Sequence, residues 1–254
     1  MGSFLNCVIY RLEKGKSFLK GRSFCPKCQH ILSWQDLVPL LSFIVLRGKC
    51  RYCHKKISWQ YPVVEIATGG LFLISYFLFL NHFLFLVFYW VIFSLLIVIF
   101  VYDLKHYIIP DKVVLPFGIL VILGRAYEYL FNVFLLKRDL GISAVGLHWH
   151  WFFALATFIF FFLIWFFSKG RAMGFGDVKL IFPLMLILGW PFGLVGLFIA
   201  FIGGSVVGLA LIAVGKKKMS SQVPFGPFLI GGAFVALFWG NMLWRWYLSI
   251  FNYG

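Results

Sequence analysis

Acidic side chains are scarce in this sequence. Asp and Glu occur only eight times in 254 residues, and charged residues of both signs make up 12% of the chain. A soluble globular domain is about one quarter charged and roughly half apolar, whereas 62% of this chain is hydrophobic. The shortage of charge excludes an ordinary soluble domain and predicts a protein that crosses a membrane several times.

Targeting signals, internal repeats and low-complexity linkers are also missing. The N-terminal stretch MGSFLNCVIYRL has neither the basic start nor the cleavage site of a secretory signal peptide. It is too short to cross a bilayer, for which a helix needs about 20 apolar residues. We therefore expect residues 1–12 to be the remnant of a first membrane helix.

Long apolar segments account for most of the remaining chain. Seven of them are candidates for membrane-spanning helices, and the short connections between them favour helical hairpins. They are Val63–Leu80, Phe83–Tyr102, Val113–Phe131, Trp149–Phe167, Val178–Trp190, Gly193–Val214 and Phe225–Ile250. The predicted fold is an all-α polytopic membrane bundle of about seven transmembrane helices, formed by residues 63–254, plus the truncated first helix.

Lys and Arg outnumber the acids and are distributed unevenly. If the seven segments alternate across the membrane, 19 of the 23 Lys and Arg lie on one side and three on the other. Basic residues accumulate in cytoplasmic loops, so the side with 19 is predicted to face the cytoplasm. This asymmetry accounts for the net charge of +15 without nucleic acid as a partner, and it favours anionic lipid headgroups as neighbours.

Only five cysteines occur, but four of them form two C-x-x-C pairs. These are Cys25 with Cys28 in CPKC and Cys50 with Cys53 in CRYC, separated by 21 residues. This spacing is typical of a Zn²⁺ site with four thiolate ligands, which is structural because it leaves no open coordination position. Disulfides are the weaker alternative in a reducing compartment, and Cys7 is expected only to pack.

The two cysteine pairs lie within residues 13–62, which we predict to form a cytoplasmic zinc module. Some zinc ribbons bind nucleic acid, and that alternative remains open for an isolated ribbon. Here the module continues directly into apolar helices, which favours a cap on the membrane bundle.

Five of the eight acids lie at the ends of the predicted spans or within them, and an Asp at the centre of a membrane helix costs about 2.5–3.5 kcal/mol. Asp103 ends one apolar segment and Asp177 begins a later one. The topology places both at the cytoplasmic edge of the membrane. Two neighbouring carboxyls do not both ionise easily, so one can act as an acid and the other as a base that activates water. The pair predicts aspartic peptide hydrolysis.

Residues beside Asp177 are suited to a substrate-binding loop. Gly174 and Gly176 allow unusual backbone conformations and the close approach of another chain, so an extended substrate could pair with this segment. Lys179 could tune the acidity of Asp177 or contact lipid phosphates.

Each acid also has a structural interpretation. Asp177 could simply be favoured by the dipole at a helix N-terminus, and Asp111 could cap the helix that it precedes. Glu65 could be a helix-start charge or a pocket residue. Glu128 lies three residues after Arg125, a spacing typical of an ion pair within one helix.

Two other functions use the same residues. A transporter could use the acids as a proton relay, but it would need acids at several depths, and these cluster at one edge. A non-catalytic membrane anchor could present the zinc module to a partner, and it would tolerate Asn at both Asp103 and Asp177.

Several segments taken together resemble the type IV prepilin leader peptidases, which are membrane aspartic peptidases. The segments are GSFLNCVIYRL, the two C-x-x-C pairs, LLSFIVLRGKCRYCHKKISWQYPVVEIATG, VYDLKHYIIPD, GFGDVKL and VPFGPFLIGG. The likeness covers essentially the whole chain. It differs in two places: the family has a full helix before GSFLN, and Glu13 stands where a Pro is usual.

This resemblance implies a division of roles. Asp103 and Asp177 would form the catalytic dyad, with Asp111 as an accessory acid. The substrates would be prepilins or pseudopilins of a pilus, type II secretion or competence system, cut at the cytoplasmic face of the bacterial inner membrane. The stretch from Glu65 to Gly69 resembles a region tied to N-methylation of the new terminus by S-adenosylmethionine. A peptidase for preflagellin or another helix is the nearest alternative, and the oligomeric state is not indicated.

Overall fold

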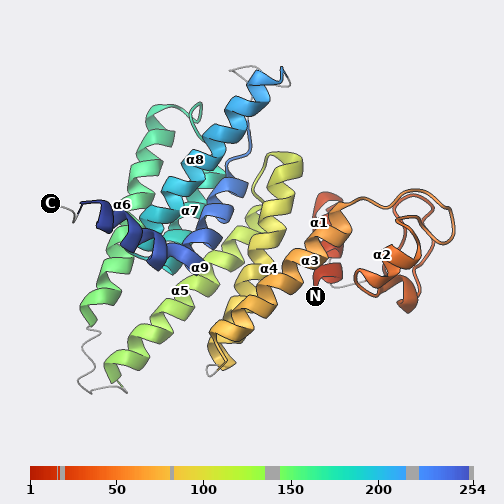
Figure 1. Ribbon diagram of the computed structural model, residues 1–254, viewed down its shortest axis with the longest axis horizontal. Helices are drawn as coiled ribbons and strands as arrows, with labels where there is room; N and C mark the ends of the chain where they lie inside the picture. Colours follow the sequence, from red (N-terminus) through yellow and green to blue (C-terminus); the bar gives the residue numbers. More distant parts are fainter. Residues whose placement is uncertain (16, 18–20, 81–82, 135–143, 216–222, 252–254) are drawn as a thin grey trace. The chain divides into compact units, whose positions relative to one another are not determined.

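We describe a computed structural model of the chain for residues 1–15, 17, 21–80, 83–134, 144–215 and 223–251. Within these ranges every regular element is helical, which confirms the predicted all-α class (Figure 1). The elements are α1 (Gly2–Glu13), η1 (Trp34–Leu37), α2 (Leu41–Val45), α3 (Gln60–Leu78), α4 (Phe83–His106), α5 (Asp111–Phe134), α6 (Ala144–Phe167), α7 (Phe175–Leu188), α8 (Phe192–Ala213) and α9 (Gly226–Phe251).

Each of the seven segments predicted to span the membrane is helical over most of its length, although α3 ends at Leu78 and α7 at Leu188, two residues before the predicted ends Leu80 and Trp190. Five are long and apolar enough to cross a bilayer, namely Gln60–Leu78, Phe83–His106, His148–Phe167, Phe192–Ala213 and Gly226–Ile250. The other two segments correspond to α5 and α7, so the total of seven crossings stays a prediction. The basic group Lys216–Lys218, which contributes to the predicted orientation, lies outside the described residues.

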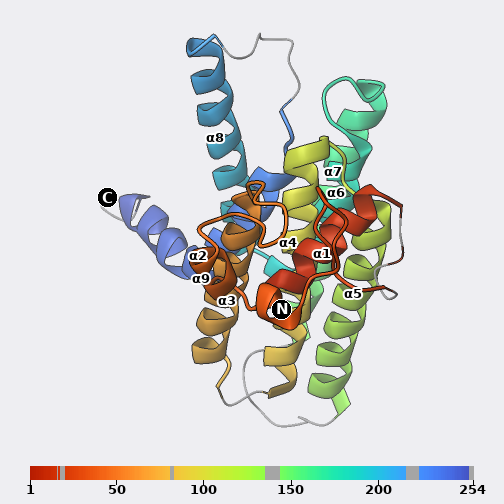
Figure 2. The ribbon, with the colours of Figure 1, turned by 90° about the vertical axis from the view of Figure 1, so that its right-hand side faces the viewer.

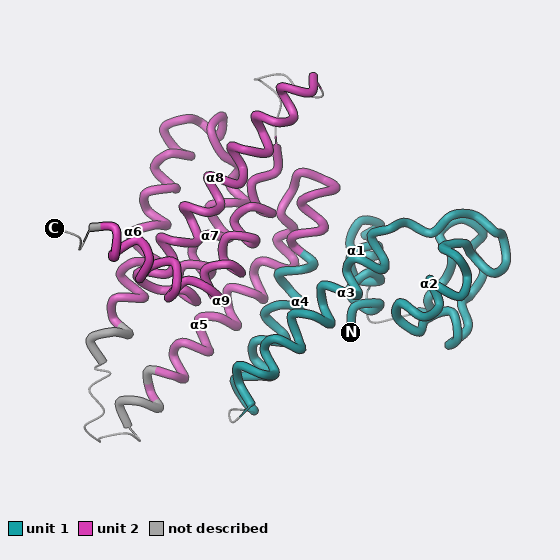
Figure 3. The backbone as a smooth tube through the Cα atoms, viewed as in Figure 1, with its two compact units in different colours: residues 1–98 teal, residues 99–254 magenta. Residues whose placement is uncertain are grey.

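The chain divides into two compact units, residues 1–98 and residues 99–254 (Figure 3). The first unit holds the cysteine-containing segment, α1, α3 and most of α4. The second holds the end of α4 and helices α5 to α9. The boundary predicted from the sequence at residue 63 separates the zinc module from the membrane bundle, and it stays a prediction.

Within the first unit, α1 packs against α3 (Figure 2). The backbones approach closely because Gly2 has no side chain: a Cβ there would lie 2.6 Å from the Cα of Glu65. Asn6 adds a polar contact, since its Nδ2 donates to the carbonyl oxygen of Tyr61 at 3.2 Å. The side-chain amide of Gln60 in turn donates from Nε2 to Asn6 Oδ1 at 3.1 Å. Small and polar residues thus join the two helices.

Within the second unit, α7 is the central helix and packs against α5, α6, α8 and α9. Its apolar side chains are buried almost without interruption from Leu180 to Leu188. Helices α8 and α9 approach closely at glycines, because a Cβ on Gly232 would lie 2.2 Å from the carbonyl oxygen of Gly196. Such small residues are typical of helix contacts inside membranes.

Helix α7 has 14 residues, or about 21 Å at 1.5 Å per residue, and it is shorter than the roughly 30 Å hydrocarbon core. Its last carbonyl groups therefore need partners from the protein. Arg125 of α5 supplies them: its Nε donates to Leu186 at 3.0 Å, and its guanidinium also donates to Ile187. Glu128 accepts from the same guanidinium at 2.5 Å, which confirms the predicted pair within α5.

Candidate active site and cysteine cluster

The two acids singled out from the sequence both belong to the second unit. Asp103 lies near the C-terminal end of α4, and Asp177 lies in the first turn of α7. Asp103 is 3% exposed and Asp177 is half-buried. Both lie near Ile109: a Cβ on Gly176, next to Asp177, would lie 3.0 Å from the Cβ of Ile109, and a Cβ on Gly226, which borders Asp103, would lie 3.1 Å from its Cδ1. Acids 74 positions apart in the sequence thus lie in one region of the second unit.

The carboxyl group of Asp103 is unusual in its hydrogen bonding. Its Oδ2 is buried and has no hydrogen-bond partner among the described residues. Buried polar atoms are normally paired, since an unpaired group retains the cost of leaving water. An exception at this point is expected where a proton, a water molecule or a substrate atom has to be bound during a reaction.

Gly226, the first residue of α9, covers this carboxyl group. A Cβ at position 226 would lie 2.6 Å from Asp103 Oδ2 and 3.1 Å from Cδ1 of Ile109. Only glycine therefore fits without displacing a neighbour. The surrounding segment VPFGPFLIGG stands out in the sequence by its resemblance to the family, but no sequence pattern assigns a role to Gly226.

The glycines before Asp177 have two different surroundings. A Cβ on Gly174 would lie 3.4 Å from Asp177 Oδ2, so Gly174 leaves room directly beside the carboxyl group. A Cβ on Gly176 would lie 3.0 Å from the Cβ of Ile109. Ile109 is buried and lies next to both Gly176 and Gly226. Gly176 thus serves packing within the protein, whereas a Cβ on Gly174 would have only the carboxyl group of Asp177 within 4 Å among the described residues.

Asp111 and Lys179 form an ion pair between the first turns of α5 and α7. The ammonium group of Lys179 also lies 5.2 Å from the centre of the Phe175 ring. Asp111, the first residue of α5, is therefore the ion-pair partner of Lys179. The predicted effect of Lys179 on Asp177 and its contact with lipid phosphates stay predictions.

The four predicted metal ligands come together in the first unit. The sulfur atoms of Cys25, Cys28, Cys50 and Cys53 all lie within 4.8 Å of one another. All five cysteines are free, and Cys25 and Cys53 have their sulfurs 4.0 Å apart, well beyond the roughly 2.05 Å of a disulfide bond. Four convergent thiols fit the ligand set that Zn²⁺ prefers.

The two cysteine pairs are held by matching loops. In the first, the backbone amide of Cys25 donates to the carbonyl oxygen of His30 at 2.9 Å. In the second, the backbone amide of Cys50 donates to the carbonyl oxygen of Lys55 at the same distance. The residue after each pair, Gln29 or His54, has a positive φ near 60°. This repeated geometry turns both thiol groups of each pair toward one point.

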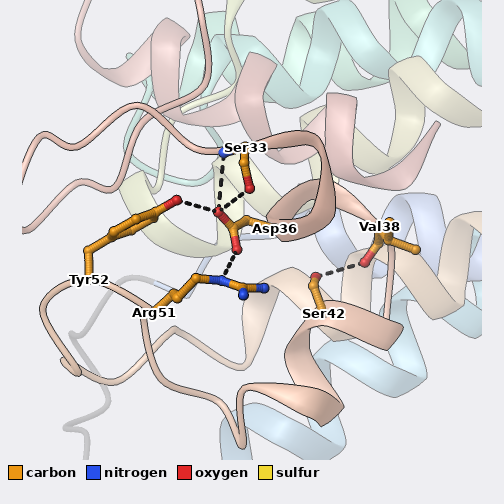
Figure 4. Close-up of polar contacts among 6 residues, drawn as sticks. All are labelled: Ser33, Asp36, Val38, Ser42, Arg51 and Tyr52. Carbon is orange, nitrogen blue, oxygen red and sulfur yellow. Dashed lines mark hydrogen bonds and ion pairs between the residues drawn. The ribbon is translucent and has the colours of Figure 1, made fainter.

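Asp36 ties the segment between the two pairs to the second pair (Figure 4). Its carboxylate accepts from Ser33 N and Oγ at 3.1 and 2.9 Å, from Arg51 Nε at 2.8 Å and from Tyr52 Oη at 3.2 Å. Arg51 and Tyr52 are the two residues between Cys50 and Cys53. Burial alone would raise the pKa of the Asp36 carboxyl, but the hydrogen bonds from Ser33, Arg51 and Tyr52 outweigh it and lower the pKa.

Glu65 lies in the second turn of α3, and its Oε2 accepts from the amide of Leu40 at 2.8 Å. Leu40 has a φ of 60°, a conformation that costs a residue with a side chain. Glu65 therefore holds the turn that leads into α2. At Gly69 a Cβ would meet no atom within 4 Å, so packing does not require a glycine there.

The chain matches two family models. Residues 1–79 match the bacterial peptidase A24 N-terminal domain, and residues 90–209 match the type IV leader peptidase family. No solved structure matches the chain.

Several relatives carry the name prepilin leader peptidase/N-methyltransferase. The one from Legionella pneumophila is 32% identical, with 98% of this chain and 91% of the relative aligned. The one from Aeromonas hydrophila is 31% identical over 99% of this chain and 91% of the relative. The one from Myxococcus xanthus is 37% identical over 85% of this chain and 62% of the relative. With five apolar helices and relatives of this kind, the chain is a multi-pass membrane protein that belongs to the type IV leader peptidase family.

Proposed function

We propose that this protein is a membrane aspartic endopeptidase that removes the short basic leader of type IV prepilins or pseudopilins. One observation carries the proposal: the segments that bear Asp103 and Asp177 meet at Ile109, and Oδ2 of Asp103 is buried without a partner among the described residues. Membership of the leader peptidase family and the names of its relatives support the choice of substrate. The proton-relay transporter and the non-catalytic anchor are not favoured.

The chemistry follows from two carboxyl groups that share one proton. Adjacent carboxyls do not both ionise easily, so one is a carboxylate and the other a carboxylic acid. The carboxylate removes a proton from a water molecule as the water oxygen attacks the scissile carbonyl carbon. The other carboxyl gives its proton to the leaving amine as the C–N bond breaks. Gly174 leaves space beside Asp177 for the backbone of the substrate.

Cleavage takes place at the cytoplasmic face of the inner membrane. The asymmetry of Lys and Arg supports this orientation, and Asp103 and Asp177 lie at the ends of the helices that adjoin the basic loops. Prepilins and pseudopilins of pilus, type II secretion and competence systems are all within this class.

The cysteine cluster holds one structural Zn²⁺ through Cys25, Cys28, Cys50 and Cys53. A bound Zn²⁺ would fix the two loops of the module, residues 13–62, as a cap on the bundle of residues 63–254. Because four thiolates saturate the ion, the module contributes folding and position to the enzyme, and no bond of the substrate is cut there.

N-methylation of the new N-terminus is a second candidate activity. The name of the relatives, prepilin leader peptidase/N-methyltransferase, favours it. S-adenosylmethionine would donate the methyl group from its sulfonium to the free amine, with loss of a proton from that amine. Glu65 and Gly69 are the candidate residues for this methylation. The Glu65 carboxylate also accepts a hydrogen bond from the backbone amide of Leu40.

The test uses the full chain in membranes with a purified prepilin and mass spectrometry of the products. We expect a shortened pilin and a separate leader peptide, and after addition of S-adenosylmethionine a product heavier by one methyl group. The same prepilin incubated with membranes that lack the protein serves as the control. An intact prepilin after incubation with folded, membrane-inserted protein would contradict the proposal.

A further inference from the structure

The short helix α2 leaves an apolar face uncovered. Leu41, Ile44 and Val45 are 59%, 70% and 67% exposed, and their spacing of three and four residues places them on one side of the helix. A cluster of exposed aliphatic side chains in a small polar module marks a surface that meets a membrane or another protein.

The position of α2 in the first unit selects between these partners. Leu40, which directly precedes α2, donates its amide to Glu65 at 2.8 Å. Glu65 lies five residues after Gln60, where the apolar helix α3 begins, which corresponds to about 7 Å along the helix axis. The start of α2 therefore lies beside the first turns of a candidate membrane span. Val63 and Ile66, which flank Glu65, are exposed apolar side chains at the same level.

The charges around α2 match a membrane surface. Residues 13–62 contain ten Lys and Arg and only two acids, Glu13 and Asp36. Arg47 and Lys49 follow α2 directly and are exposed. Trp59, which precedes α3, is exposed too, and Trp is enriched where helices enter the headgroup region. Anionic lipid headgroups attract such basic segments.

We propose that α2 is an interfacial helix. It inserts Leu41, Ile44 and Val45 into the cytoplasmic leaflet while Arg47 and Lys49 contact anionic headgroups. The Glu65 carboxylate fixes this helix to α3 through the amide of Leu40. The cysteine module is thereby held flat on the bilayer, and this role of α2 does not depend on which peptide the protein cleaves. An interfacial helix of this kind binds through buried apolar area and electrostatic attraction together.

The test uses the full zinc-loaded chain in lipid nanodiscs, with a photo-crosslinking amino acid in place of Ile44. The matched control carries the same residue in place of Lys27, which is also exposed but lies in the first cysteine loop. We expect phospholipid adducts at position 44 and none at position 27, with more adduct in anionic than in zwitterionic nanodiscs. If position 44 forms no lipid adduct, or crosslinks to a second copy or to a prepilin instead, the proposal is wrong.

Two further measurements keep the test independent of one variant. If the Ile44 variant does not retain Zn²⁺, the same probe replaces Val45, for which the expected and contradicting outcomes are the same. In the unaltered protein, the amides of residues 41–46 should exchange hydrogen more slowly in anionic than in zwitterionic nanodiscs. Equal exchange in the two lipids would contradict the role of Arg47 and Lys49.

Discussion

Two acids of this protein have side chains shielded from water and opposite surroundings. Only 3% of the Asp36 side chain is exposed, although the residue as a whole is half-buried, and Asp103 is buried. Asp36 accepts four hydrogen bonds from Ser33, Arg51 and Tyr52, whereas Asp103 Oδ2 has no partner among the described residues. A carboxylate whose partners are all in place stabilises a fold. A buried carboxyl oxygen that lacks partners is free to exchange a proton, and a second acid beside it makes that exchange useful.

The largest effect is expected from removing the proposed metal ligand Cys50, which directly precedes Arg51, a hydrogen-bond partner of Asp36. Changing Cys50 to Ser leaves three thiols at the site, so the proposed Zn²⁺ should no longer hold the two loops together and residues 13–62 should unfold. Zinc content and proteolysis of the cytoplasmic segment measure this loss. Cys7→Ser is the matched control, because Cys7 lies outside the cluster. A Cys50→Ser protein with resistant loops after verified zinc removal would contradict a structural role for the ion.

The next largest effect is expected on the cleavage rate, from filling the space beside Asp103. A methyl group on Gly226 would lie 2.6 Å from Asp103 Oδ2, so Gly226→Ala should displace the carboxyl or the start of α9. A displacement of about 1 Å at a reacting group can cost about 100-fold in rate, which kinetics with a prepilin peptide would reveal. Gly231→Ala is the control, because a Cβ there meets nothing within 4 Å. Equal activities of the two variants would show that Gly226 does not position Asp103.

Replacing each acid by Asn compares how much Asp36 and Asp103 contribute to stability. Asp36→Asn removes an acceptor for Arg51 or Ser33 and should lower the unfolding free energy of the module by about 1–3 kcal/mol. Asp103→Asn should leave thermal stability close to that of the unaltered protein, because it removes no hydrogen bond from Oδ2. A larger loss of stability at Asp103 than at Asp36 would reverse the comparison.

The Asp36 contribution should also depend on pH. The folded pKa of Asp36 is lowered relative to the unfolded state, so its stabilising effect is present above the unfolded pKa of about 3.9. The effect disappears as the pH falls through the lower folded pKa. Protonated thiols release Zn²⁺ in acid, so the comparison is made between about pH 6 and pH 8, well above both pKa values of Asp36. The difference in melting temperature between the unaltered protein and Asp36→Asn should be constant there, and a difference that changes with pH would argue against a carboxylate with a lowered pKa.

The smallest effect is expected at the exposed ion pair. Asp111→Asn removes the partner of Lys179, and both side chains are open to water. Exposed pairs contribute about 0–1 kcal/mol, so cleavage and stability should change little. Kinetics with a prepilin peptide at low and high salt measure this. A loss of activity as large as that for Gly226→Ala would assign Asp111 a part in the reaction.

Much of this arrangement could be predicted from local sequence patterns. Long apolar segments identify the helices, because membrane spans need continuous apolar surface. The spacing of Cys25, Cys28, Cys50 and Cys53 predicts their convergence, because two short loops close a tetrahedral site. Asp103 and Asp177 stand out because acids are so rare in the chain.

Other features depend on contacts between distant segments and leave no local pattern. Ile109 lies beside both Gly176 and Gly226, and no spacing in the sequence indicates that it does. The same is true of Arg125, which satisfies the end of α7 as well as its predicted partner Glu128. These contacts arise only when the helices pack, so the structure is needed to find them.

The measurement that tests the central claim most directly is cleavage of a prepilin by Asp103→Asn and Asp177→Asn in membranes. Asn keeps the size of each side chain but neither takes up nor releases a proton as the carboxyl does. Each variant should retain zinc and membrane insertion while losing cleavage, and the variant Asp111→Asn should keep it. Cleavage at the unaltered rate by either Asp103→Asn or Asp177→Asn would contradict the catalytic pair.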